Sequence, residues 1–285
     1  MSRLAKTSAF AIVALALSPI AAMSQNDLIR VPVSAPVDTD AAGRGGDAAL
    51  QSVVRIICRN EGSSGTGFLH RSGKIVTAAH VIANCAQPSV VGANGVELFG
   101  KVEARDDDLD LALLGTAFPV GSNAIPISPG SDFQIGTQVT TWGFPGGYSG
   151  GQPLLSAGYL SGVQGFRRRS GTGVIKQWVV NAAFNSGNSG GPLIHIETGT
   201  VIGVVSSKLA PISADTQQIL AILEQQQSGL TYTQTLSSGQ TITVTEGKLI
   251  GRVLDELRRQ VQLVVGYAAT ADDLRAFLSS HGVEP

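Results

Sequence analysis

Short apolar, β-branched runs separated by Gly, Pro, Asn and Asp fill the chain from residue 52 to residue 206. Runs of this length and spacing predict the strands of an all-β sandwich or barrel. A single helical turn at 80–85 interrupts the pattern. The predicted strands are 53–58, 67–70, 74–77, 100–104, 110–114, 138–143, 158–163, 176–180, 192–196 and 201–206.

After residue 211 the apolar positions change their period. Recurrence every three and four residues predicts amphipathic helices, whereas strict alternation predicts a hairpin. In chain order the predicted elements are a helix around 219–223, a hairpin over 230–245, a helix over 248–262, a strand over 263–268 and a helix over 271–282. Thr270 or Asp272 is expected to cap the last helix.

Composition indicates a globular protein without a polyanionic partner. The 285 residues carry 20 basic and 21 acidic side chains, a formal net charge of -1, which argues against nucleic-acid binding. Hydrophobic residues make up 43% and charged residues 14%, and the 35 glycines are typical of a turn-rich fold. We expect no cofactor and no metal.

The first 24 residues are predicted to be a cleavable secretory signal peptide. Arg3 and Lys6 precede an apolar run at 9–17, and a stretch of small residues ends at Ser24. The apolar run is short for a bilayer span, with an uncleaved anchor as the alternative. Residues 25–49 are predicted to be a flexible lead-in. We therefore expect a periplasmic or secreted protein that does not contact the membrane after cleavage.

The two cysteines, Cys58 and Cys85, are an even number in a chain expected to be exported. One disulfide is therefore predicted, with two buried free thiols as the alternative. Metal binding would need more ligands beside them.

Three segments together can supply nucleophilic catalysis by a serine. A serine hydroxyl needs a general base within hydrogen-bond reach and a carboxylate that orients this base. A predicted strand delivers His80 at its end, and another begins at Asp110. The third segment, Gly187-Asn188-Ser189-Gly190-Gly191, permits a tight turn whose N–H groups can form an oxyanion hole. The order His, Asp, Ser along the chain favours this interpretation.

In these motifs the sequence resembles the trypsin-like serine proteases, and among them the bacterial high-temperature-requirement (HtrA/Deg) branch, over about 52–208 and again from 265. The resemblance implies two six-stranded antiparallel β-barrels with the active site between them. The first barrel would cover about 50–118 and the second about 130–208 plus 263–270, within a protease domain over 50–285. An insertion at 209–262, absent from that family, would separate the last strands, and no peptide-binding PDZ domain is expected to follow.

On matching positions the resemblance implies that His80 is the base, Asp110 the orienting acid and Ser189 the nucleophile. The N–H groups of Gly187 and Ser189, on either side of Asn188, would form the oxyanion hole. Asp108 is the rival for the acid, although Asp110 directly precedes the Leu-Ala-Leu strand.

The same resemblance places Ala183, six residues before the nucleophile, at the base of the primary specificity pocket, where an acid would select Lys or Arg. The predicted pocket residues are Ala183, Phe184, Val205, Ser206 and Ser207. They predict an endopeptidase that cleaves polypeptides after small or medium apolar residues, with its oligomeric state left open.

Two alternatives remain at this point. Gly187-x-Ser189-x-Gly191 also fits the nucleophile elbow of an α/β-hydrolase esterase, but that fold needs its acid and histidine after the serine. A catalytically inactive protease-fold binding module is the other.

Overall fold

A computed structural model of the chain describes residues 46–117, 123–168, 171–206, 214–225, 229–235, 241–260 and 263–285. All of them belong to one compact unit. The predicted signal peptide at 1–24 and most of the lead-in at 25–49 lie outside the described residues. The end of that lead-in is helical, because α1 spans Gly46–Ser52.

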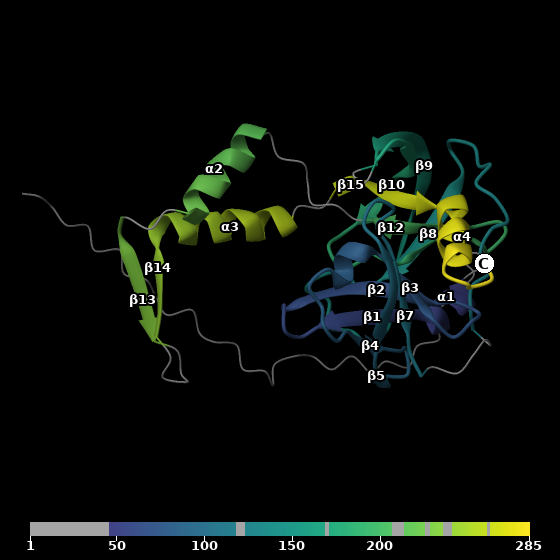
Figure 1. The fold of residues 1–285 in the computed structure, drawn as a ribbon, viewed down its shortest axis with the longest axis horizontal. Coiled ribbons are helices and arrows are strands. Elements are labelled where there is room, and N and C mark those ends of the chain that lie inside the picture. The colour runs from purple at the N-terminus through teal and green to yellow at the C-terminus, as the bar shows by residue number, and fades with distance from the viewer. Residues whose placement is uncertain are drawn as a thin grey trace, which may run out of the picture. The chain divides into compact units, whose positions relative to one another are not determined.

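The first half of the described chain, coloured purple to blue in Figure 1, forms a seven-stranded antiparallel sheet. The order of its strands is β5-β4-β1-β2-β3-β7-β6. Its strands are β1 (Val53–Cys58), β2 (Ser63–Leu69), β3 (Ile75–Thr77), β4 (Ser89–Val91), β5 (Glu97–Phe99), β6 (Lys101–Asp106) and β7 (Leu111–Gly115). The expected closed six-stranded barrel is thus an open sheet with one more strand. β4 and β5 were not predicted, because three residues each are too short for a visible alternation.

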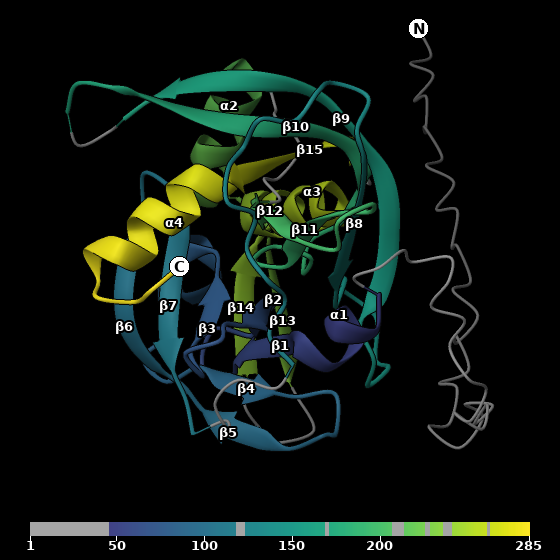
Figure 2. The ribbon, with the colours of Figure 1, turned by 90° about the vertical axis from the view of Figure 1, so that its right-hand side faces the viewer.

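The second half forms a closed antiparallel barrel in the order β10-β15-β12-β11-β8-β9, as the resemblance implied. Its strands are β8 (Gln138–Gly143), β9 (Leu154–Arg167), β10 (Val174–Phe184), β11 (Pro192–His195), β12 (Val201–Ser206) and β15 (Leu263–Thr270). β9 and β10 extend together as a long hairpin (Figure 2). The all-β prediction is confirmed.

Four further elements lie between β12 and β15 along the chain, where the insertion was predicted. They are α2 (Ala214–Gln225), β13 (Thr231–Thr235), β14 (Thr241–Thr245) and α3 (Glu246–Gln260). β13 pairs with β14, α2 packs against α3, and α3 contacts β14. The predicted helix, hairpin and helix are therefore present, while the turn at Ser238-Gly239 lies outside the described residues.

Buried side chains form three apolar clusters that explain how the two halves are joined. One cluster lies within the first sheet and one within the barrel. The third combines residues of both, such as Phe68 and Leu113 with Trp142 and Val204. Helix α4 (Ala271–Ser280) adds Leu274, Phe277 and Leu278 to this shared cluster.

Thr270 caps α4, because its side chain accepts a hydrogen bond from Asp273 N. This selects Thr270 from the two predicted caps.

The predicted disulfide is confirmed. Cys58, at the end of β1, is bonded to Cys85 with a Cα–Cα distance of 5.5 Å. Cys85 follows a short 3-10 helix, η3 (Ala79–Ile82), which contains His80. The bridge thus ties the segment around His80 to the first strand.

No helix in the described part of the chain is long and apolar enough to cross a membrane.

Candidate active site

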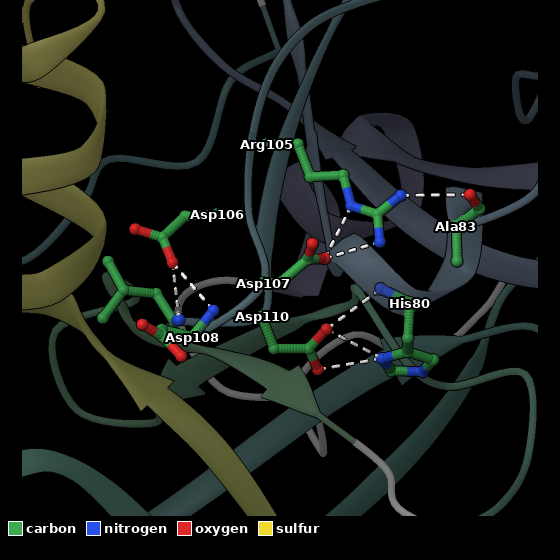
Figure 3. Close-up of polar contacts among 8 residues, drawn as sticks. His80, Ala83, Arg105, Asp106, Asp107, Asp108 and Asp110 are labelled. Atoms are coloured by element: carbon green, nitrogen blue, oxygen red, sulfur yellow. Dashed lines mark hydrogen bonds and ion pairs between the residues drawn. The ribbon is translucent and has the colours of Figure 1, made fainter. Parts of the chain in front are cut away.

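His80, shortly after β3, and Asp110, directly before β7, meet at one end of this strand pair (Figure 3). The Nδ1 atom of His80 lies 2.9 Å from Oδ1 and 2.8 Å from Oδ2 of Asp110. The backbone N–H of His80 also donates to Oδ1 at 3.0 Å. An ionised carboxylate only accepts hydrogen bonds, so this geometry assigns the proton to Nδ1 and leaves Nε2 as the free acceptor. The His80 side chain is 44% exposed, and that of Asp110 is 13% exposed.

The backbone of Asp110 adopts a conformation that is unusual for a side-chain-bearing residue. Its φ is 56°, the only positive φ of a non-glycine residue among those that the structure describes. The carboxylate of Asp106 stabilises the turn before it by accepting hydrogen bonds from Asp108 N and Leu109 N, both at 2.9 Å. Aspartate tolerates this left-handed region better than most residues, but at some cost. The turn therefore holds Asp110 in a strained position that faces His80.

The neighbouring acids have other partners. Asp107 accepts a hydrogen bond from Arg105 Nε at 2.6 Å, and Arg105 also donates to the Ala83 carbonyl at 3.1 Å (Figure 3). Asp106 organises the turn. Of the acids at 106–110, Asp110 is the one whose carboxylate the structure joins to His80, which favours it over Asp108.

Ser206 provides a further hydrogen bond to Asp110, from its hydroxyl to Oδ2. Burial raises the pKa of Asp110, but the hydrogen bonds from His80 and Ser206 and the charge of His80 outweigh burial, so the pKa lies below its ordinary value. Because the folded pKa is the lower one, the stability gained from these contacts is present above about pH 4 and is lost as the pH falls through the folded pKa.

The turn around Ser189 depends on glycine at its close approaches. Gly187 and Gly190 have φ values of 97° and 85°, which glycine adopts without strain. A Cβ at Gly190 would collide with the Thr66 carbonyl and would lie 2.8 Å from Ala78 N. Ala78 precedes η3, so the Ser189 turn lies against the segment that carries His80.

Thr66 connects this turn to the first sheet, a role that sequence reasoning missed. Its N–H donates to the Ser189 carbonyl at 2.9 Å, and its hydroxyl donates to the Gly187 carbonyl at 2.6 Å. The same hydroxyl accepts from Phe144 N at 3.0 Å. Thr66 is fully buried. The signal that could have revealed this role is the position of Thr66, a polar residue between two glycines just before the apolar residues of a strand.

Asn188 folds back into the protein. Its Nδ2 donates to the Ala183 carbonyl at 3.2 Å, and its N–H donates to Asn185 O at 3.0 Å. The residue is buried, so its side chain shapes the turn from inside.

The predicted pocket residues occupy different environments. Ala183 is exposed. Phe184 and Val205 belong to the apolar cluster inside the barrel, with the Phe184 ring against Gly266. Ser206 contacts Asp110, as described above, and Ser207 lies outside the described residues. The structure thus places Phe184 in the barrel core, because alternation along β10 turns its side chain inward.

The described residues contain no group of three or more His, Cys, Asp and Glu side chains able to hold a metal ion.

Comparison with known proteins identifies the family of the central part of the chain. A family model for the trypsin-like peptidase domain matches residues 65–204, which include His80, Asp110 and Ser189. This part of the chain belongs to the trypsin-like serine protease family.

Within that family the chain is similar to HtrA/DegP-type proteins. It is 34% identical over 155 residues to the chloroplastic Protease Do-like 1 of Arabidopsis thaliana, covering 53% of this chain and 34% of that protein. It is 35% identical over 149 residues to a probable periplasmic serine endoprotease DegP-like of Bartonella henselae, covering 52% of this chain and 28% of that protein. The chain thus spans about a third of these relatives' lengths.

Solved structures show the same fold. The active form of the Rv3671c protease from M. tuberculosis aligns with a TM-score of 0.57 at 18% identity, covering 90% of this chain and 91% of that one. The HtrA-type protease AlgW with a tripeptide aligns with a TM-score of 0.54 at 20% identity, covering 83% of this chain and 63% of that one. The chymotrypsin-like fold prediction is confirmed, and the α/β-hydrolase alternative is wrong because the barrel strands are antiparallel.

Proposed function

We propose that this chain is an exported serine endopeptidase that uses Ser189, His80 and Asp110 as its catalytic triad. The observation that supports this most is the orientation of His80, whose Nδ1 faces both carboxylate oxygens of Asp110. This contact fixes the tautomer in which Nε2 can accept a proton. The trypsin-like peptidase domain and the DegP-like relatives support the same reaction class and a periplasmic or secreted location.

In the proposed reaction the Ser189 hydroxyl oxygen attacks the carbonyl carbon of the scissile peptide bond, and Nε2 of His80 takes the hydroxyl proton. Asp110 holds the resulting imidazolium ion. The N–H groups of Gly187 and Ser189 donate hydrogen bonds to the tetrahedral oxyanion. His80 then gives the proton to the leaving amine, and an acyl-enzyme forms. A water molecule, deprotonated by His80, hydrolyses the acyl-enzyme by the same steps.

The proposed substrates are polypeptides with a small or medium apolar residue before the cleaved bond. Ala183 stands at the position where an acid would select Lys or Arg. Its backbone carbonyl accepts a hydrogen bond from Asn188 Nδ2. This arrangement supplies no negative charge for a basic side chain.

The test is Ser189→Ala, with Ser161→Ala, an exposed serine on β9, as the matched control. A fluorophosphonate probe should label the wild-type protein and Ser161→Ala but not Ser189→Ala. Peptide turnover should fall by about a millionfold in Ser189→Ala, because the nucleophile acts as a unit with its base. Labelling that persists in Ser189→Ala would contradict the assignment. A wild-type protein that is neither labelled nor active would instead support the inactive binding module.

A further inference from the structure

The segment that connects β8 to β9 is attached to the first sheet by Arg55 of β1. One terminal nitrogen of Arg55 donates to the carbonyl oxygens of Tyr148 at 3.1 Å and of Gly150 at 2.8 Å. The guanidinium carbon also lies 4.6 Å from the centre of the Phe144 ring, within the range of a cation–π contact. Three contacts from one side chain thus hold residues 144–150, here named the 144–150 loop.

The 144–150 loop in turn holds the turn that carries Ser189. The N–H of Gly146 donates to the Ser186 carbonyl at 2.6 Å. The peptide unit between Ser186 and Gly187 is planar and trans, so its carbonyl and the Gly187 N–H point in opposite directions. Fixing the carbonyl therefore fixes the direction of the Gly187 N–H, the first proposed oxyanion donor.

The backbones of the loop and the turn pack closely against each other, on the side of Gly187 where other residues carry a Cβ. A Cβ at Gly187 would collide with the Phe144 carbonyl and would lie 2.9 Å from Gly146 N. The loop itself is closed by a hydrogen bond of 3.1 Å from Tyr148 N to the Pro145 carbonyl. A displacement of the loop would consequently displace Gly187.

Arg55 and Thr66 hold this region from one face of the first sheet. They are directly opposite partners in the β1–β2 ladder, so their side chains project to the same side. Thr66 bonds the start of the loop and the Gly187 carbonyl, whereas Arg55 bonds the loop beyond its tip. Neighbouring side chains of the first sheet thus contact residues close to both partners of the Gly146–Ser186 hydrogen bond.

We propose that Arg55 is a positioning residue for the oxyanion hole, acting through the 144–150 loop and the Ser186 carbonyl. This inference rests on the proposed function of Ser189. Arginine suits the role because its guanidinium donates to the two carbonyl oxygens within its plane while its flat face lies over the Phe144 ring. The compact ammonium of lysine has no such face and a shorter reach. A change at Arg55 should therefore act on the transition state, in which the oxyanion exists, more than on substrate binding.

The experiment compares Arg55→Met, Arg55→Lys and the control Arg59→Met. Arg59 lies just after β1 and forms an exposed ion pair with Glu97 at 2.6 Å, so its loss should leave activity unchanged. In Arg55→Met, kcat for a peptide substrate should fall about 10- to 100-fold with KM within about threefold, as expected for a misaligned oxyanion donor. Arg55→Lys should lose nearly as much.

Two further measurements separate positioning from folding. A peptide aldehyde, which forms a tetrahedral adduct with Ser189, should lose affinity by the same factor as kcat, whereas the matching peptide alcohol should bind as before. Hydrogen exchange should quicken in the 144–150 loop. The amides of β8 and β9 are paired within the barrel, so they should stay protected.

The outcomes distinguish this inference from the proposed function. An active wild type whose kcat and aldehyde affinity are unchanged in Arg55→Met would overturn the role of Arg55 alone. An equal loss in Arg59→Met would overturn it as well. Absence of Ser189-dependent turnover in the wild type would overturn the proposed function.

Discussion

At the residue scale, the site depends on one strained backbone position. Sequence reasoning identified Asp110 because it directly precedes an apolar strand, but neither spacing nor residue type reveals a φ of 56°. The strain is offset by the contacts of the carboxylate with His80 and Ser206. Those contacts form between residues 30 and 96 positions apart, so they depend on the completed fold.

This strain can be measured by replacing Asp110 with glycine and with alanine. Both changes remove the carboxylate, but only glycine adopts a positive φ freely, so Asp110→Ala should be less stable than Asp110→Gly by about 1 kcal/mol. Urea unfolding gives the difference. At Asp107, in the same turn but without a positive φ, the order should reverse because glycine costs more chain entropy. If alanine were the more stable replacement at position 110 as well as at position 107, Asp110 would not be strained.

At the scale of elements, the bounds of strands with a strong apolar pattern could be predicted from the sequence. The bounds of strands that continue only because they pair with a neighbouring strand could not. β1, β8 and β12 have the predicted bounds, because β-branched residues fill them and turn residues flank them. β9 extends past its predicted end into a glycine-containing stretch that pairs only with β10. Most side chains in this stretch are exposed, so its sequence shows no alternation of apolar and polar residues.

Site residues followed the same division. His80, Asp110 and Ser189 stand in motifs that the chain order makes recognisable. Thr66 and Arg55 act through backbone carbonyls and N–H groups of distant loops, and such partners have no residue-type signature. The sequence therefore indicated the residues of the proposed triad, but not Thr66 and Arg55, which contact the surrounding loops.

The disulfide is the element-scale link whose removal is simplest to test. Replacing both Cys58 and Cys85 with alanine should lower the free energy of unfolding by about 3.5 kcal/mol, the chain-entropy expectation for a separation of 27 residues. Turnover at low temperature should fall less than about tenfold, because Asp110 still bonds His80. Chemical denaturation and peptide assays measure both effects.

A reductant supplies the control. It should lower the stability of the wild type to that of the double variant and should leave the double variant unchanged. A wild type that is insensitive to reductant under unfolding conditions would show that the bridge adds nothing to stability.

At the scale of the whole molecule, the two halves share one apolar cluster, and the insertion stands outside it. The three apolar clusters contain no residue of α2, β13, β14 or α3 within the described chain. Ile250, Val253 and Leu254, on the apolar side of α3, are 43%, 51% and 44% exposed. The register of β12 with β15, from Gly203↔Thr270 to Ser206↔Tyr267, is formed by barrel residues alone.

These observations predict that the barrel folds without the insertion. Ser206 and Tyr267 are paired neighbours, so a short Gly-Ser linker replacing residues 209–262 can close the connection as a hairpin loop. The shortened protein should unfold cooperatively within about 5 °C of the wild type, since no residue of the shared cluster is lost. Its turnover of a short peptide should stay within about threefold of the wild-type value, because Ser206 still bonds Asp110.

Calorimetry and a peptide assay test these two expectations. Ser189→Ala in the shortened protein is the control, because it shows whether turnover uses the same site. Loss of cooperative unfolding would place the insertion in the folding core, and a folded but inactive protein would make it part of the active site.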